Sequence, residues 1–507
     1  MNTAVYTLFQ YLRNLAAARP ELPLLGDEGG WRTAEECLRC VEAGAGLLYS
    51  SGLRPGDLAA LRCERSVNTV LTLLCLQRLG AAAVLVSPKE DLRQTAAACS
   101  PPLNTAAFLS ADGGPLRPAI LLRRPGEDAP VRLPLCASGV TPAPVWDDPD
   151  APAFYIFTSG SSGEKKAVVL SQGNLVSNLL DSAPLGGYFE DDIALGALPL
   201  DHVFGLALLT GAVVLGHGLY LTGAVVLGHG LYLTGASSPE ELLQVIRRER
   251  ITRMNGVPSL YLALAEKAGR YGVDSLRAGY IGGAPWTPKQ FRYIESALGM
   301  TLVPVYGMSE CIGISCASFH APQAERMAGV GPFYPANEGR IPRRTALRPP
   351  QGEEGEVCVN GPMRMLGYHD PAQTARAIDG DGFLHTGDLG RVDGNGVLHL
   401  TGRKKDIIIR NGVNLSPRRI EDALLSLPNV QSAAVVGLPD EQCGELPWAA
   451  AVCPEGGPDG LMEGLRRCLA KNELPAGILC LDSMPMTATG KPDKRRIREL
   501  LRQNLQK

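Results

Sequence analysis

Hydrophobic residues recur at helical spacing near the start of the chain, at Val5, Leu8, Phe9, Leu12 and Leu15. This spacing predicts an amphipathic helix that ends before Pro20. A second helix is predicted over 67–79, closed by Gly80, and an apolar strand over 82–86 follows it. This alternation of helix and strand predicts a layered α/β domain with parallel strands.

The same alternation continues through the middle of the chain. Short apolar runs predict strands over 153–157, 167–170, 278–284 and 302–305, and a helix is predicted over 239–249. Between residues 114 and 152 prolines recur without periodicity, which predicts an irregular crossing segment. We place no domain boundary there, because the strands that follow need the preceding residues to complete their sheet.

The pattern changes from Gly355 onward. Strands become short and are separated by Gly, Asn and Asp turns, as in a small antiparallel sheet or β-barrel. After a charged interruption, a strand over 407–409, a helix over 417–427, a strand over 433–436 and a closing helix predict a compact α+β unit. We therefore expect an N-terminal domain over 1–403 and a C-terminal domain over 404–507, with the hinge at Lys404 and Lys405.

One stretch is duplicated letter for letter. Residues 209–220 read LTGAVVLGHGLY, and residues 221–232 repeat them. Structural repeats normally drift and need several copies to stack, so a single perfect copy indicates a recent duplication or a sequence error. The uncharged run over 203–238 is long enough to mimic a membrane span, but its glycines and its flanks favour a buried helix, a Gly-His-Gly turn and a short strand. We expect one copy to be displaced or to extend an existing element.

Composition narrows the class of protein. With 45% hydrophobic residues, the chain is expected to be globular. At 507 residues it is too long to fold around one hydrophobic core, so we expect at least two domains. A net charge of −3 with mixed signs offers no basic surface for nucleic acid or anionic membrane. Thirteen cysteines without a regular framework, and no basic-then-apolar leader before Arg19, predict a cytoplasmic protein. The pair Cys37 and Cys40 is expected to be buried in a helix and to bind no metal.

A loop rich in Gly, Ser and Thr joins the strands predicted over 153–157 and 167–170. It reads Thr158-Ser159-Gly160-Ser161-Ser162-Gly163-Glu164-Lys165-Lys166. Glycines let the backbone close around an anion, and hydroxyls, amide groups and a lysine complement its charge. The spacing differs from that of P-loop ATPases, and most such turns bind nothing, so the loop predicts a phosphate site only together with other motifs.

Further motifs follow in a fixed order: Pro199-Leu200-Asp201-His202, Gly282-Gly283-Ala284-Pro285, Tyr306-Gly307-Met308-Ser309-Glu310, His385-Thr386-Gly387-Asp388, Gly402-Arg403-Lys404-Lys405-Asp406 and Thr489-Gly490-Lys491. Together they resemble the adenylate-forming superfamily, which includes acyl-CoA synthetases, adenylation domains of peptide synthetases and firefly luciferase. The resemblance covers residues 6–501. It implies a large N-terminal domain, a small mobile C-terminal domain, and an active site between them.

The resemblance also implies roles for individual residues. The phosphates of ATP would be held by Thr158, Ser159, Gly160, Ser161, Ser162, Gly163 and Lys166. The adenosine and the α-phosphate would be bound by Gly283, Ala284, Pro285, Tyr306, Gly307, Ser309, Asp388 and Arg403. Glu310 would be the Mg²⁺ ligand, and Lys491 would stabilise the charge that develops as a carboxylate attacks the α-phosphate.

The sequence departs from the family pattern at several positions. Lys165 stands where proline is common, Ala167 where glycine is common, and Gln172 where histidine is usual. Met486 and Pro492 flank the lysine motif atypically. None of these changes removes an expected anion ligand or catalytic group.

The substrate is expected to be a small carboxylic acid. Amino-acid-activating members place an aspartate near the substrate amine, whereas His202 occupies that position and joins Lys491 among the expected catalytic residues. This favours an acid without an α-amine, although a shift of one residue would place Asp201 there. Asn411-Gly412 matches the segment that lines a pantetheine tunnel, so CoA is the expected acceptor.

Three functions remain open at this stage. The first is an acid:CoA ligase that uses ATP, Mg²⁺ and CoA. The second is a free-standing adenylation enzyme that loads an acyl or aminoacyl group onto a carrier protein in trans, since no carrier attachment site follows Lys491. The third is a nucleotide-binding relative disabled by the duplicated segment 209–232.

Overall fold

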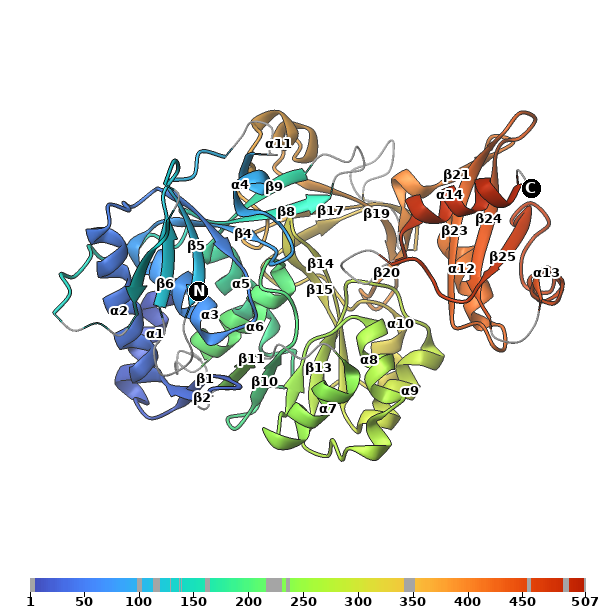
Figure 1. Ribbon diagram of the computed structural model, residues 1–507. Helices are drawn as coiled ribbons and strands as arrows, with labels where there is room; N and C mark the ends of the chain where they lie inside the picture. The colour runs from blue at the N-terminus through green and yellow to red at the C-terminus, as the bar shows by residue number, and fades with distance from the viewer. Residues whose placement is uncertain are drawn as a thin grey trace.

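Two large mixed sheets form most of the protein. The computed structural model describes residues 5–97, 103–112, 119–127, 129–135, 137, 139–159, 165–215, 230–233, 238–341, 352–453, 457–486 and 492–505. Within these residues the fold is α/β, with a large N-terminal domain and a small C-terminal one, as expected from the sequence (Figure 1).

The first sheet has the strand order β18-β9-β8-β4-β3-β5-β6-β7. Its strands are β3 (Leu58–Arg62), β4 (Ala82–Val86), β5 (Ala107–Asp112), β6 (Ala119–Arg123), β7 (Val131–Pro134), β8 (Pro152–Ser159), β9 (Lys165–Ser171) and β18 (Gly367–Tyr368). Strands β5, β3, β4 and β8 are parallel, and antiparallel strands complete both edges. The expectation of an irregular segment over 114–152 was wrong for 119–134, because β6 and β7 extend this sheet as an antiparallel hairpin, whereas 139–151 have no helix or strand, as expected. The short strands of the hairpin have no clear alternation of polar and apolar residues, so only pairing with β5 reveals them.

The second sheet has the order β15-β14-β13-β12-β10-β11-β1-β2. Its strands are β1 (Pro23–Asp27), β2 (Gly30–Thr33), β10 (Ile193–Gly196), β11 (Gly230–Leu233), β12 (Arg253–Met254), β13 (Ala278–Ile281), β14 (Thr301–Met308) and β15 (Cys311–Cys316). All neighbours from β1 to β14 are parallel, and β2 and β15 close the edges as antiparallel strands.

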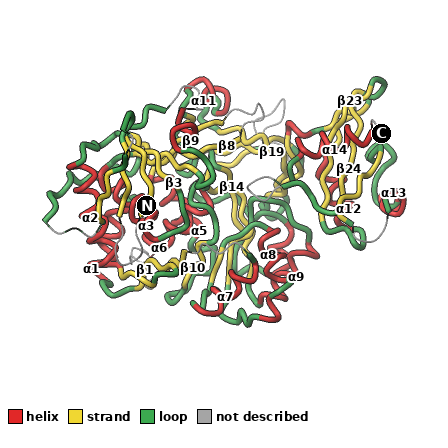
Figure 2. The backbone as a smooth tube through the Cα atoms, viewed as in Figure 1, coloured by secondary structure: helices red, strands yellow, loops and turns green. Residues whose placement is uncertain are grey.

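Helices fill the space between the two sheets and cover their outer faces. In chain order they are α1 (Leu8–Ala18), α2 (Ala34–Ser50), α3 (Val67–Leu79), α4 (Leu92–Ala97), α5 (Gln172–Ser182), α6 (Val203–Leu215), α7 (Pro239–Arg248), α8 (Pro258–Ala265), α9 (Pro288–Leu298), α10 (Gln323–Ala328) and α11 (Pro371–Ala377), with a 3₁₀ turn, η1, over Ala268–Arg270. All residues of α3 are buried, because it contacts β3, β4 and β5 on one side and β1 on the other. Gly80 ends α3 in the left-handed conformation that glycine adopts without strain, as predicted. Helices α7, α8 and α9 belong to a separate apolar cluster beside β12 to β14 (Figures 1 and 2).

A third, antiparallel sheet precedes the small C-terminal unit. It contains β16 (Glu338–Arg340), β17 (Gly355–Asn360), β19 (Leu384–Val392) and β20 (Leu398–Arg403). The C-terminal unit contains β21 (Ile408–Arg410), β22 (Val413–Leu415), β23 (Ser432–Asp440), β24 (Gly444–Val452), β25 (Gly477–Leu481), α12 (Pro417–Ser426), α13 (Pro458–Arg466) and α14 (Lys494–Leu505). A 3₁₀ turn, η2 (Lys404–Asp406), joins the two, and Figure 1 shows the C-terminal unit as a lobe attached through β20.

The duplicated segment is divided between two elements. Helix α6 ends at Leu215 inside the first copy, and β11 begins at Gly230 near the end of the second. The predicted helix and strand are thus confirmed, and the turn residues between them lie outside the described residues. No described helix has the length and apolarity needed to cross a membrane.

Candidate active site

Asp388 lies between a tyrosine and an arginine that come from two other strands. Tyr306 Oη, on β14, donates to Asp388 Oδ2 at 2.7 Å, and Arg403 Nε, on β20, pairs with Asp388 Oδ1 at 2.8 Å. Asp388 and Arg403 are direct partners in the β19–β20 ladder, which fixes their distance. Burial and the charge of Asp388 raise the pKa of Tyr306 well above its usual value, so its hydroxyl stays protonated and keeps donating. Tyr306, expected beside the adenine, is therefore in contact with Asp388, expected at the ribose, and Asp388 is in contact with Arg403.

The backbone that carries Asp388 is also fixed. Thr386 Oγ1 donates to the carbonyl oxygen of Val357 at 2.8 Å and accepts from the N–H of Asp388 at 3.1 Å. Gly387 between them has φ +72°, which glycine adopts without strain. The Thr-Gly-Asp motif thus places a buried carboxylate in one orientation.

Glu310 and Lys166 are connected through a tyrosine that the sequence analysis did not single out. Tyr368 Oη, on β18, donates to Glu310 Oε1 at 2.7 Å, and Lys166 Nζ lies 5.0 Å from the centre of the Tyr368 ring. Glu310 is buried in the turn between β14 and β15. Tyr368 approaches Lys166 because β18 pairs with β9, a contact between segments almost 200 residues apart that no local pattern reveals.

The side chains of Lys165 and Lys166, at the end of the Gly/Ser-rich loop, point to opposite faces of the first sheet. Thr158 is opposite Lys166 and Ser159 is opposite Lys165 in the β8–β9 ladder. Lys165 forms an ion pair with Glu90 at 2.6 Å, whereas Lys166 points to the Tyr368 and Glu310 side, because successive strand residues alternate. The remaining loop residues, Gly160, Ser161, Ser162 and Gly163, lie outside the described residues, as does Lys491.

The loops that follow β13 and β14 lie at one edge of the second sheet, because the two strands are parallel neighbours. Gly283, Ala284 and Pro285 follow β13, and Gly307 and Ser309 are at the end of β14. A Cβ on Gly307 would lie 2.2 Å from the carbonyl oxygen of Ile312, so no larger residue fits there. Glycine at this position therefore lets β14 approach β15 closely.

His202 and Asp201 follow β10, two positions from β13 in the same sheet, and so lie at the same edge. The carbonyl oxygen of His202 accepts from the N–H groups of Gly205 and Leu206, which starts α6. Burial raises the pKa of Asp201, the nearby His202 lowers it in part, and Asp201 Oδ1 is buried without a hydrogen-bond partner. Gln172 has a structural role, since its Oε1 accepts from the N–H of Leu8 at 2.7 Å.

The second and third sheets meet where the buried Tyr306 and Asp388 contact Arg403, and a small α+β unit follows; this arrangement defines the adenylate-forming class of enzymes. The chain belongs to this class: residues 12–369 match the family described as AMP-binding enzyme, and residues 419–491 match the AMP-binding enzyme C-terminal domain.

Curated relatives and solved structures agree with this assignment. The chain is 31% identical to a feruloyl-CoA synthase of Amycolatopsis sp. over 487 residues, 92% of this chain and 93% of the relative. It is also 31% identical to the salicyl-AMP ligase / salicyl-S-ArCP synthetase of Mycobacterium tuberculosis, over 97% of this chain and 90% of the relative. Its fold is similar to that of ATP-bound MatB from Rhodopseudomonas palustris, with a TM-score of 0.83, 25% identity, and coverage of 97% of this chain and 98% of that one.

Proposed function

We propose that this protein activates a small carboxylic acid with ATP, releasing pyrophosphate and forming an acyl-AMP, and then transfers the acyl group to CoA. The observation that carries the proposal is the Tyr306–Asp388–Arg403 cluster, because its fixed, buried carboxylate suits the two hydroxyl groups of a ribose. Membership of the AMP-binding family supports the first half-reaction, and relatives that are CoA ligases support the second.

In this proposal each group supplies position or charge. Asp388 accepts from the ribose hydroxyls, and the backbone at 283–285 with Tyr306 borders the adenine. Thr158, Ser159 and Lys166, with the loop residues between them, bind the β- and γ-phosphates, and Ser309 binds the α-phosphate. Lys491 stabilises the negative charge that builds up as the acid's carboxylate oxygen attacks the α-phosphorus and the bond to pyrophosphate breaks.

The donor set around Glu310 suits Mg²⁺. A hard cation prefers carboxylate and phosphate oxygens, and Glu310 is a buried carboxylate held by Tyr368 on the side of the phosphate loop. When bound, the ion would supply positive charge to the phosphates. Glu310 would hold it, and Tyr368 would orient Glu310.

A carrier protein is the second candidate acceptor of the acyl group. The M. tuberculosis relative carries a name that includes loading of a carrier protein, and it aligns with 97% of this chain. The turn at Asn411 and Gly412, both at positive φ, is the segment that we expect to border the pantetheine of either acceptor. Supplying CoA and a purified acyl-carrier protein side by side separates the two functions: thioester formed only on the carrier would refute the CoA proposal.

The first test is carboxylate-dependent exchange between ATP and labelled pyrophosphate, across acids with and without an α-amine. His202 predicts exchange with acids that lack the amine. Lys491→Ala should lose exchange far more than it loses thioester formation from preformed acyl-AMP, whereas Arg495→Ala, an exposed basic residue of α14, should keep both. An equal loss of both half-reactions in Lys491→Ala would contradict the role proposed for this lysine.

A further inference from the structure

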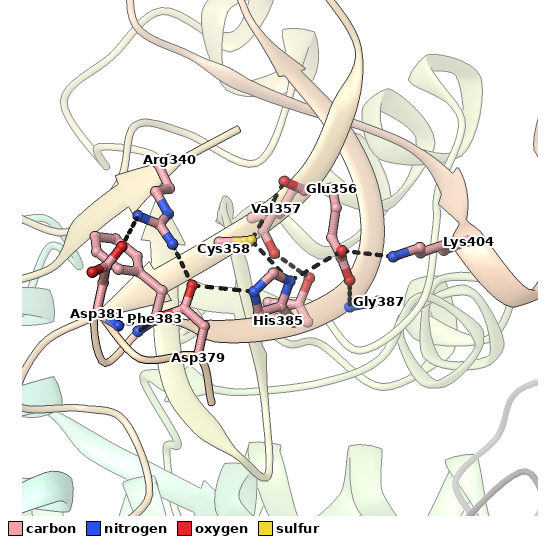
Figure 3. A network of polar contacts seen from close by, with 11 residues as sticks. Arg340, Glu356, Val357, Cys358, Asp379, Asp381, Phe383, His385, Gly387 and Lys404 are labelled. Atoms are coloured by element: carbon pink, nitrogen blue, oxygen red, sulfur yellow. Dashed lines mark hydrogen bonds and ion pairs between the residues drawn. The ribbon is translucent and has the colours of Figure 1, made fainter. Parts of the chain in front are cut away.

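Three side chains of the third sheet converge at a point outside the nucleotide site. Glu356 and Cys358 lie two residues apart on β17 and share one face, and His385 on β19 is the direct ladder partner of Cys358. One donor atom from each of the three lies within 4.8 Å of the other two. Figure 3 shows the carboxylate, thiol and imidazole directed toward one another.

Their distances suit a tetrahedral ion. His385 Nδ1 lies 3.5 Å from Cys358 Sγ and 3.1 Å from Glu356 Oε2. Zinc bonds of about 2.0 to 2.3 Å at tetrahedral angles place ligand atoms about 3.3 to 3.6 Å apart. Small side-chain rotations would therefore bring all three atoms around one ion, with a fourth position open to water.

The outer hydrogen bonds are those of a metal-binding histidine. His385 Nε2 lies 3.2 Å from Asp379 Oδ2, which directs the opposite nitrogen, Nδ1, toward the thiol. Asp379 is itself held by the N–H groups of Asp381 and Phe383, and by Arg340. Glu356 Oε1 accepts from the N–H of Gly387 at 3.1 Å, which fixes the carboxylate.

In the structure, Lys404 supplies a positive charge next to Glu356 of this cluster. Lys404 Nζ pairs with Glu356 Oε2, the same oxygen that faces His385, at 3.0 Å. The Lys404 side chain is 65% exposed, so it can turn into water when a cation takes its place. Arg340, the second nearby cation, pairs with Asp379, stacks on Phe383 and also forms a side-chain hydrogen bond with Cys358, so a cation that binds the thiol would replace this contact.

We propose that Glu356, Cys358 and His385 form a site for a borderline-soft divalent cation of the Zn²⁺ class, which competes with Lys404 for Glu356. The thiol and imidazole exclude Mg²⁺ as the preferred occupant, so this site is chemically distinct from Glu310. His385 lies three residues before Asp388 on β19. Lys404, which the bound cation would release, directly follows Arg403. Occupancy would thus loosen the last residue that ties the inter-domain turn to the third sheet.

The test is a titration of the full-length protein with Co²⁺ alone, with Mg²⁺ present in excess. We expect one equivalent to bind with a thiolate-to-cobalt charge-transfer band in the near ultraviolet, and Zn²⁺ to displace it. Cys358→Ser should abolish the band, and Cys468→Ser, which removes an exposed cysteine elsewhere, should keep it. His385→Gln tests a partly exposed ligand in case Cys358→Ser does not fold.

Two further variants test the surroundings rather than the ligands. Asp379→Asn should weaken Co²⁺ binding by about 10- to 100-fold, as expected for a carboxylate that orients a ligating histidine. Lys404→Ala removes the competitor and should tighten binding. A band that survives Cys358→Ser and His385→Gln, the absence of any thiolate band, or binding unchanged in Lys404→Ala would overturn the proposal.

Discussion

Asp388 is the residue on which the proposed nucleotide site depends, and two partners hold it. A buried carboxylate is costly unless it is paired and hydrogen-bonded, and here one oxygen faces a guanidinium and the other a phenol. Since Arg403 is partly exposed and Tyr306 is buried, the tyrosine sets the orientation and the arginine supplies charge.

Tyr306→Phe should therefore weaken ATP binding without unfolding the protein. A hydrogen bond to a charged group contributes about 1.5 kcal/mol, so we expect the Kd for ATP to rise about tenfold. Isothermal titration calorimetry measures this directly. Tyr261→Phe is the matched control, because Tyr261 is also buried but donates to backbone carbonyls of Met254 and Tyr280. An equal rise of Kd in both variants would show that the effect is not specific to Asp388.

The burial of Asp201 predicts that the free energy of unfolding depends on pH. Because burial makes its pKa higher in the folded protein than in the unfolded chain, the folded state binds more protons between the two pKa values. The free energy of unfolding contributed by this group therefore falls as pH rises through that interval. Asp201→Asn should be more stable than the parent at pH 7 by on the order of 1 kcal/mol, and the gain should vanish below the ordinary aspartate pKa of about 3.9.

Urea unfolding at pH 3.5 to 8 checks this expectation. Asp147→Asn changes the same charge at an exposed position, and its profile should stay parallel to that of the parent. A stability gain in Asp201→Asn that does not depend on pH would contradict the burial argument.

At this scale, local motifs singled out residues that the structure brings into contact. The Thr-Gly-Asp turn, Tyr306 and Arg403 each belong to such a motif, and their roles in binding stay predictions. Tyr368 and Glu356 were missed, because their importance comes from strand pairings, β9 with β18 and β17 with β19, that join distant parts of the chain. A lone tyrosine after a glycine carries no signal of the glutamate that it contacts.

At the scale of elements, β10, α6 and β11 form a parallel crossover unit that contains the duplication. The helix and the strand were predictable from the apolar run and its glycines, whereas the pairing of β11 between β10 and β1 was not. Since α6 ends in the first copy and β11 begins in the second, the length of one extra copy separates the two elements in the sequence, and we expect it to belong to their connection.

Deleting residues 221–232 should therefore preserve both elements. The shortened chain still reads GAVVL followed by GHGLYL, and a glycine directly after the helix is a favourable C-terminal cap. A two-residue connection is within the usual range between a helix and the next strand, and closing a shorter loop should raise stability by about 1 kcal/mol. Thermal unfolding measures the change.

The same deletion distinguishes an active enzyme from a disabled relative. If the parent catalyses ATP–pyrophosphate exchange and the deletion keeps it, the duplication is a tolerated insertion. Exchange that appears only after the deletion would support a disabled parent. A deletion protein that does not fold would contradict the assignment of the extra residues to the connection.

At the scale of the whole molecule, the turn between the two units includes Lys405, whose side chain has no hydrogen bond or ion pair with the described residues of either unit. Arg403 and Lys404 pair with Asp388 and Glu356 of the large unit, whereas Asp406 pairs with Lys494 of the small unit at 3.5 Å. Lys405 lies between them and is exposed. Each of these three ion pairs lies on one side of Lys405, so a rotation there would leave them intact and would mainly disturb the contact of α12 with β20, where Ser416 Oγ donates to the carbonyl oxygen of Thr401.

Lys405→Pro tests whether this rotation separates the two half-reactions. Proline fixes φ near −65°, so the turn keeps one geometry and cannot make the large φ change of a hinge. If the described arrangement is the one that forms acyl-AMP, pyrophosphate exchange should stay within a few-fold of the parent while thioester formation falls by about 100-fold or more. The reverse pattern would assign the described arrangement to the thiol step instead. Lys405→Ala removes the same charge but leaves φ free, so both half-reactions should persist in it. Equal rates for the proline and alanine variants in both assays would show that catalysis needs no rotation at this residue.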